Sequence, residues 1–135
     1  MRLNSSRLSA VGRAALFIGL FTTSAIAQAL DVKLFSAELL ANAQKADKPV
    51  AVHFHADWCP TCRKQATALE RLKADKSLDT VTVLIANYDA ERDLRRSMQI
   101  RTQSTLVVFK GTNERARLAG ESDETKLATA LRSAL

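Results

Sequence analysis

The stretch Trp58-Cys59-Pro60-Thr61-Cys62 contains the only two cysteines of this 135-residue chain, and it lies where an apolar run gives way to a helical pattern. Side chains three residues apart in a first helical turn lie about 5–6 Å apart, whereas a disulfide needs Cβ atoms about 3.5–4.5 Å apart. A small movement therefore makes or breaks a bond between the two sulfurs. A purely structural disulfide closing so short a loop would add little stability. We therefore predict dithiol–disulfide redox chemistry at Cys59 and Cys62.

The two cysteines are predicted to differ because of their places on the helix. Cys59 fits the N-cap, since Pro60 is well suited to the first helical position. A Cys59 thiolate could accept hydrogen bonds from free backbone N–H groups at Thr61 and Cys62, and the helix dipole adds about 0.3–1 kcal/mol. One pKa unit corresponds to about 1.36 kcal/mol. We expect Cys59 to be the exposed, reactive thiol and Cys62 the shielded one.

Residues 1–27 have the pattern of a secretory signal peptide: arginines at positions 2, 7 and 13 precede an apolar run over residues 14–21 and an Ala-Ile-Ala triplet. The apolar run is shorter than the roughly 20 residues that span a bilayer. We expect cleavage after Ala27, with Ala29 as second choice and an uncleaved membrane anchor as the alternative. The expected location is periplasmic or secreted, where a cysteine pair stays oxidised unless a donor reduces it.

The predicted mature chain, residues 28–135, has the length of one compact domain. Loss of the leader removes three arginines and lowers the formal net charge from +6 to +3. The remaining basic residues alternate with acidic ones, as in residues 91–96, which is typical of a solvated helix face. We expect a monomer with no nucleic-acid partner and no cofactor.

Hydrophobic periodicity predicts alternating helices and strands in this domain. Ser36 fits the N-cap of a first helix, and from Pro60 the inward positions are Cys62, Ala66, Leu69 and Leu72. The predicted order is a helix after residue 36, a strand at 50–56, a helix from 60, a strand at 80–86, a helix at 90–98, strands at 105–109 and 115–119, and a last helix capped by Ser122. This is a βαβ unit followed by a ββα unit, hence an α/β fold with a sheet covered on both faces.

The chain resembles the thioredoxin family at residues 56–64 (ADWCPTCRK), at residues 100–111 (IRTQSTLVVFKG) and at Gly120. This resemblance implies a thioredoxin fold with a central mixed sheet and helices on both faces. It also implies that Cys59 attacks disulfides and Cys62 resolves the mixed disulfide. Trp58, Gln103, Ser104 and Thr105 match positions that contact substrate in the family.

The sequence Ala-Asp-Trp-Cys at residues 56–59 and the segment Leu84 to Asn87 resemble the corresponding segments of periplasmic thioredoxin-like domains of the thiol:disulfide interchange reductase type. That similarity favours reduction of protein disulfides, with electrons supplied by a membrane or periplasmic donor. Pro60 leaves the direction of electron flow open, because more oxidising relatives also have a proline there.

The chain departs from the family at Ser104, where the family has a cis-proline. A cis bond before a non-proline residue costs about 2.5–4 kcal/mol, against about 0.5–1 kcal/mol before proline. We therefore expect a trans or locally rearranged Gln103–Ser104 bond. His53 stands where the family often has a buried acid, so it is the predicted proton acceptor for Cys62. His55 follows on the same face of the strand.

A competing hypothesis is a metal-binding or metallochaperone module. Cys59, Cys62, His53 and His55 would then hold copper or zinc, since thiolates and imidazoles suit both ions. The missing proline keeps this hypothesis open, because in the family that residue is thought to keep metals away from the dithiol. The simpler interpretation of the histidines is as core or rim residues bonded to backbone groups.

Overall fold

The computed structural model describes residues 29–135, so the predicted signal peptide lies outside the described residues. The strands are β1 (Leu30–Leu34), β2 (Pro49–His55), β3 (Val81–Asn87), β4 (Thr105–Lys110) and β5 (Asn113–Ala119). The helices are α1 (Ala37–Lys45), α2 (Pro60–Leu72), α3 (Arg92–Ser97) and α4 (Glu124–Arg132), with a short 3-10 helix at Lys76–Leu78. Within residues 29–135, every helix is too short or too polar to cross a membrane.

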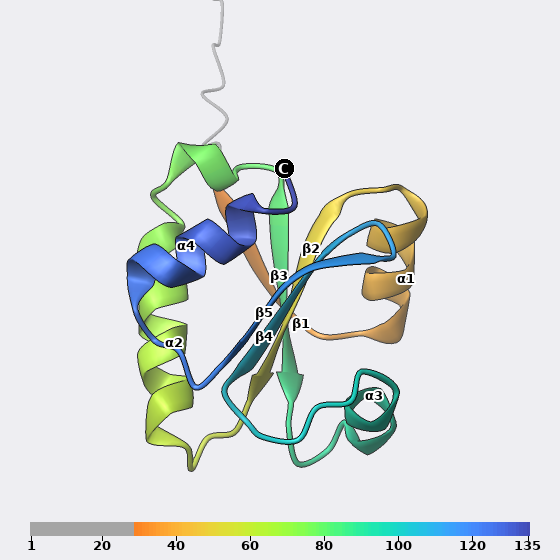
Figure 1. Cartoon of the computed structure of the whole chain (residues 1–135), viewed down its shortest axis with the longest axis vertical. Coiled ribbons are helices and arrows are strands. Elements are labelled where there is room, and N and C mark those ends of the chain that lie inside the picture. Colours follow the sequence, from red (N-terminus) through yellow and green to blue (C-terminus); the bar gives the residue numbers. More distant parts are fainter. Residues whose placement is uncertain (1–28) are drawn as a thin grey trace, which may run out of the picture.

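The five strands form one mixed sheet in the order β1-β3-β2-β4-β5. β3 pairs in parallel with both β1 and β2, whereas β4 pairs antiparallel with β2 and β5. Helices α2 and α4 cover one face, and α1 and α3 lie on the other (Figure 1). This arrangement confirms the predicted βαβ unit, the ββα unit and the sheet covered on both faces.

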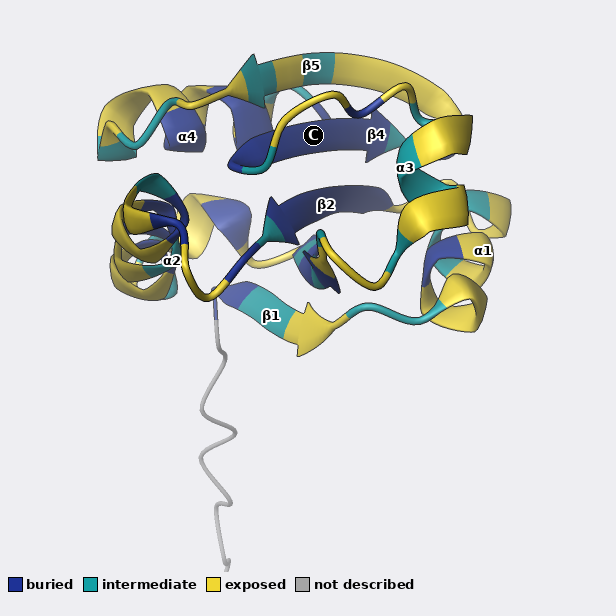
Figure 2. Cartoon of the chain, turned by 90° about the horizontal axis from the view of Figure 1, so that it is seen from below, coloured by how far each residue is buried: buried dark blue, intermediate teal, exposed yellow. Residues whose placement is uncertain are grey.

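Strand β2 lies at the centre of the sheet, and all but its last residue are buried. Figure 2 shows β2 and β4 as buried strands between the more exposed edges β1 and β5. Because side chains alternate along a strand, Val50, Val52 and Phe54 join the apolar cluster that contains Leu40 of α1. Ala51 instead joins the cluster formed with α2 and α4. The sheet therefore separates two cores.

Two predicted boundaries need correction. Strand β1 is absent from the predicted order, which begins with the helix after residue 36, yet β1 pairs with β3 at the sheet edge. The last helix is capped by Asp123, whose carboxylate accepts the Lys126 N–H at 3.0 Å, and not by Ser122. The predicted N-cap of α1 is confirmed, because the Ser36 hydroxyl accepts the Leu39 N–H at 3.1 Å.

The buried stripe of α2 also differs from the prediction at one position. Ala66 is only half-buried, whereas Gln65 is fully buried. Gln65 lies three residues after Cys62 and four before Leu69, so it continues the inward stripe at helical spacing. A polar side chain therefore occupies a core position directly behind the cysteines.

Candidate functional site

The two cysteines lie at the start of α2, just beyond the end of the central strand. Cys59 is the N-cap, Pro60 occupies the first turn, and the Cys59 sulfur accepts the Cys62 N–H at 3.1 Å. The Cys59 N–H donates to the Ala56 carbonyl at 3.0 Å, which fixes the turn between β2 and α2. The structure therefore confirms the predicted cap geometry.

Both cysteines are free thiols, and both are buried. Cys62 is 0% exposed as predicted, but Cys59 is only 2% exposed, so the expected exposure of the N-cap thiol is wrong. Ala56 and Tyr88 pack against the pair, and the loop that carries Ser104 lies over the sulfurs. Exposure thus does not distinguish the two thiols in this structure.

Electrostatics separates the two thiols instead. Burial acts to raise the pKa of Cys59, but hydrogen bonds from the Cys62 thiol, the Ser104 hydroxyl and backbone N–H groups outweigh it, and the net pKa is lowered. Burial, and then the hydrogen bond to Cys59, raise the pKa of Cys62. Cys59 is therefore the thiol that ionises first, and Cys62 keeps its proton.

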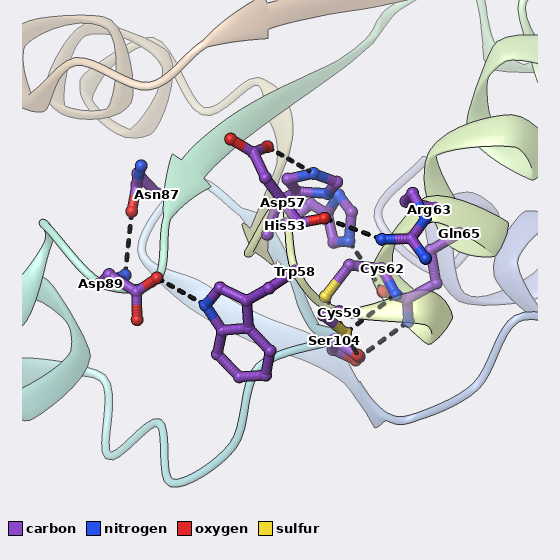
Figure 3. Close-up of polar contacts among 11 residues, drawn as sticks. His53, Asp57, Trp58, Cys59, Cys62, Arg63, Gln65, Asn87, Asp89 and Ser104 are labelled. Atoms are coloured by element: carbon purple, nitrogen blue, oxygen red, sulfur yellow. Dashed lines mark hydrogen bonds and ion pairs between the residues drawn. The ribbon is translucent and has the colours of Figure 1, made fainter.

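Ser104 lies beside both sulfurs. Its Oγ is 3.0 Å from the Cys59 Sγ and 3.2 Å from the Cys62 Sγ (Figure 3). The Gln103–Ser104 bond is trans, as are the other peptide bonds of residues 29–135, and Ser104 has a φ of 60°. Its N–H donates to the Phe54 carbonyl and its own carbonyl accepts the Gly120 N–H, both at 2.9 Å. The loop is thus rearranged locally, as the sequence led us to expect.

Gln65, which is not among the predicted site residues, connects this loop to the central strand. Its Nε2 donates to the carbonyls of Ser104, at 2.9 Å, and of Glu121, at 2.5 Å. Its Oε1 lies 2.7 Å from the Nε2 of His53. The one signal in the sequence is its helical spacing from Cys62, which places it on the inward stripe.

This network fixes the tautomer of His53. Because two carbonyls require the amide nitrogen of Gln65 as donor, its Oε1 must accept, and the proton of a neutral His53 therefore lies on Nε2. Nδ1 then carries a lone pair, and it is buried without a hydrogen-bond partner. The pKa of His53 is lowered to about 4, mainly by burial. The hydrogen bond to Gln65 acts to raise this pKa, and the neighbouring His55 lowers it further. His53 is thus a neutral base near neutral pH.

His55 lies at the rim of the site, half-buried, with its Nε2 3.3 Å from the Asp57 carboxylate. Its ring centroid is 5.5 Å from that of His53, as expected for one face of a strand. Nevertheless, the described part of the chain contains no group of three or more His, Cys, Asp or Glu side chains able to hold a metal ion. The metal-binding hypothesis therefore has no support from the structure.

The predicted substrate-binding residues surround the cysteines unevenly. Trp58 is 59% exposed, and its indole N–H donates to the Asp89 carboxylate at 2.8 Å (Figure 3). Gln103 is half-buried beside Ser104. Thr105 is buried at the start of β4, and its hydroxyl donates to the Thr102 carbonyl at 2.8 Å. Among these four predicted residues, Trp58 therefore offers the largest exposed surface.

A mixed sheet covered on both faces, with a buried CxxC pair at the helix that follows its central strand, defines a thioredoxin-fold dithiol protein. A thioredoxin family model matches residues 28–133, and the chain belongs to the thioredoxin family. It is accordingly a thioredoxin-like disulfide oxidoreductase with Cys59 and Cys62 as its cysteine pair.

The individual relatives are consistent with this assignment. Thioredoxin of Alicyclobacillus acidocaldarius is 37% identical over 98 residues, covering 70% of this chain and 92% of the relative. Thioredoxin of Rhodospirillum rubrum is 40% identical over 83 residues, covering 62% and 79%. Among solved structures, Trxlp from Edwardsiella tarda has a TM-score of 0.71 at 30% identity, covering 75% of this chain and 98% of that chain. These matches confirm the thioredoxin fold.

Proposed function

We propose that this protein is an exported reductase of protein disulfides, with Cys59 as the nucleophile and Cys62 as the resolving thiol. The observation that carries the proposal is the opposite displacement of the two pKa values, with that of Cys59 lowered and that of Cys62 raised. The thiolate is the form that attacks a disulfide. Cys59 is therefore the thiol that is more easily deprotonated for attack, while Cys62 stays protonated until the mixed disulfide has formed.

The reaction then has two steps. The Cys59 thiolate attacks one sulfur of a substrate disulfide, that bond breaks, and the released thiolate takes a proton from the surroundings. Cys62 next loses its proton and attacks the Cys59 sulfur, which expels the second substrate thiol and leaves a Cys59–Cys62 disulfide. The substrate gains two electrons, and a dithiol donor must return the site to its reduced form.

His53 is the proposed acceptor of the Cys62 proton. The Nδ1 atom of His53 is buried and has no hydrogen-bond partner. The lowered pKa of His53 keeps the imidazole neutral near pH 7, so Nδ1 can accept a proton. Within the described residues no hydrogen bond joins His53 to Cys62, so the transfer needs an intervening water molecule or a movement of the ring. General bases of this kind typically contribute about 10²–10⁴-fold to a rate.

The remaining parts of the proposal concern binding and location. Trp58, Gln103, Ser104 and Thr105 form the proposed docking edge, where an extended substrate segment can lie beside the dithiol. The leader, residues 1–27, supports export to the periplasm or outside the cell. In such an oxidising compartment a membrane or periplasmic donor must supply the electrons.

Competition between the two thiols for an alkylating agent tests the assignment. Reduced protein is treated briefly with iodoacetamide across a pH series, and the modified peptide is identified by mass spectrometry. We expect Cys59 to react first at every pH below its ordinary pKa range, whereas the denatured chain should show equal rates. Faster reaction of Cys62 in the native protein would contradict the proposal.

Expression with the leader intact, followed by fractionation and sequencing of the amino terminus, tests export and cleavage after Ala27.

A further inference from the structure

The hydroxyl of Ser104 is the one side-chain group outside the cysteine pair that bonds both sulfurs in residues 29–135. Its Oγ lies 3.0 Å from the Cys59 Sγ and 3.2 Å from the Cys62 Sγ. A serine hydroxyl has one hydrogen to donate and two lone pairs with which to accept. When Cys59 is a thiolate, the Ser104 hydroxyl donates its hydrogen bond to the Cys59 sulfur. A lone pair of the Ser104 oxygen then faces the Cys62 thiol.

We infer that Ser104 is a catalytic residue of this dithiol. Its hydroxyl donates a hydrogen bond to the Cys59 thiolate, and its oxygen, together with the Cys59 sulfur, accepts from the Cys62 S–H. Through these contacts Ser104 favours the reduced form of the pair. This inference deepens the proposed function and rests on Cys59 being the nucleophile. The lowered pKa of Cys59, to which the Ser104 hydrogen bond contributes, agrees with it.

The backbone holds this hydroxyl in place from both sides. The Ser104 N–H is bonded to the Phe54 carbonyl of the central strand, and the Ser104 carbonyl accepts from Gly120 and from the buried amide of Gln65. A φ of 60° is unfavourable for a residue with a side chain and persists only where the surroundings impose it. Since Ser104 is 3% exposed, bulk water cannot compete freely for its hydroxyl. The donor is therefore already oriented before a substrate arrives.

The same contact has a consequence for the redox equilibrium. A hydrogen bond to a thiolate stabilises the dithiol state, whereas the disulfide state offers no anion to that donor. Donation from Ser104 therefore raises the reduction potential of the pair and lowers the pKa of Cys59 together. A proline or alanine at this position has no hydroxyl and lacks both effects.

Ser104→Ala tests the inference, because it removes the hydroxyl and retains the β-carbon. We expect the pKa of Cys59, followed through thiolate absorbance, to rise by about one unit. We also expect the equilibrium constant against glutathione to shift about tenfold toward the disulfide, which is about 30 mV. Thr67→Ala is the matched control on α2, since its exposed hydroxyl donates to the Arg63 carbonyl and touches neither sulfur. It should change neither quantity.

A second variant guards against misfolding of the loop. Ser104→Gly also lacks the hydroxyl but accepts a positive φ without strain, so it should reproduce the changes in pKa and equilibrium constant in a stably folded protein. Unchanged values in either folded variant would overturn the inference. Mass spectrometry of the alkylated peptide separates the two proposals: a pKa rise at Cys62 with Cys59 unreactive would refute the choice of nucleophile, whereas reactive Cys59 with an unmoved pKa would refute only the role of Ser104.

Discussion

The two faces of the central sheet are made by the same strands, yet they bury different chemistry. Toward α1 and α3, β2 presents Val50, Val52 and Phe54, and the cluster there is apolar. Toward α2 and α4, the same strand presents the fully buried His53, which bonds Gln65 of α2. One face is therefore lined mainly by apolar side chains, while the other encloses a connected polar network behind the dithiol.

This difference indicates that the two faces of the sheet have different roles within one small domain. Buried polar groups lower stability unless each finds a partner, and on the α2 face the Nδ1 atoms of both His53 and His55 are buried without one. Both unsatisfied atoms lie on the face that carries the cysteines. The α1 face contributes hydrophobic stability, and the α2 face gives up part of that stability for proton and electron transfer.

The largest expected effect comes from the end of the network, at Cys62. Cys62→Ser should abolish turnover, because no second thiol can expel the substrate, and a mixed disulfide through Cys59 should accumulate. Non-reducing electrophoresis followed by peptide mapping measures this. Val52→Ala, on the apolar face, should lower the free energy of unfolding but leave turnover intact. Equal loss of turnover in both variants would break the contrast between the faces.

Replacement of the buried imidazole should have the next largest effect. His53→Leu removes the proposed base, so resolution of the mixed disulfide should slow by about 10²–10⁴-fold. Attack by Cys59 should change little, because the helix terminus and Ser104 stabilise its thiolate. Stopped-flow measurement of the two steps across pH distinguishes them. If both steps slow equally, or if resolution is unaffected in a folded variant, His53 is an ordinary core residue.

The pH dependence of stability should also reveal the polar face. The pKa of His53 is about 4 in the folded protein and about 6.5 when unfolded, so between these values the unfolded chain binds more protons. The stabilisation present above pH 6.5 should therefore be lost as the pH falls toward 4, by about 3 kcal/mol in total.

Denaturant unfolding of the wild type and His53→Leu across this range measures the effect. Carboxylates with lowered pKa values also lose stabilisation in acid, but they are present in both proteins and cancel in the difference: Asp75, Glu114 and Glu121. A difference between wild type and variant that does not change with pH would show that folding does not lower the pKa of His53.

The smallest expected effect compares one introduced side chain on the two faces. Gln65→Met keeps the volume but leaves the His53 N–H and the Glu121 carbonyl without their partner, which should cost about 1–3 kcal/mol. Leu84→Met on the apolar face should cost less than about 1.5 kcal/mol. Chemical denaturation measures both. A larger loss at Leu84 would mean that packing, and not the polar network, limits stability.

The sequence was sufficient for the central elements, because strong periodicity and turn signals coincide there. The central strand, predicted at 50–56 and found at Pro49–His55, the cap at Cys59 and the pair of strands β4 and β5 all follow from local chemistry. Strand β1 was missed although Leu30, Val32 and Leu34 alternate with Asp31 and Lys33, which is the period-2 pattern of a half-buried strand. Its pairing with β3 is decided by tertiary contact.

The site shows the same limit. The positions of the cysteines and the trans bond before Ser104 could be predicted, since both depend on local geometry. The burial of Cys59 and the role of Gln65 could not, because each depends on a loop about 40 residues later in the chain folding over the start of α2. The predicted inward stripe contained Ala66 in place of Gln65, and only the fold shows the partners of the Gln65 amide.

The parallel pairing of β1 with β3 has a practical consequence for attachment. Leu30 pairs with Val81 at the start of β3, whereas His55 pairs with Asn87 at its end, and seven residues of strand span about 20 Å. The chain thus enters at one end of the sheet, Leu135 lies at that same end (Figure 1), and the dithiol lies at the other. A fusion partner or surface linker joined ahead of Ala29 would therefore leave the end of the sheet that carries the dithiol unobstructed for large protein substrates.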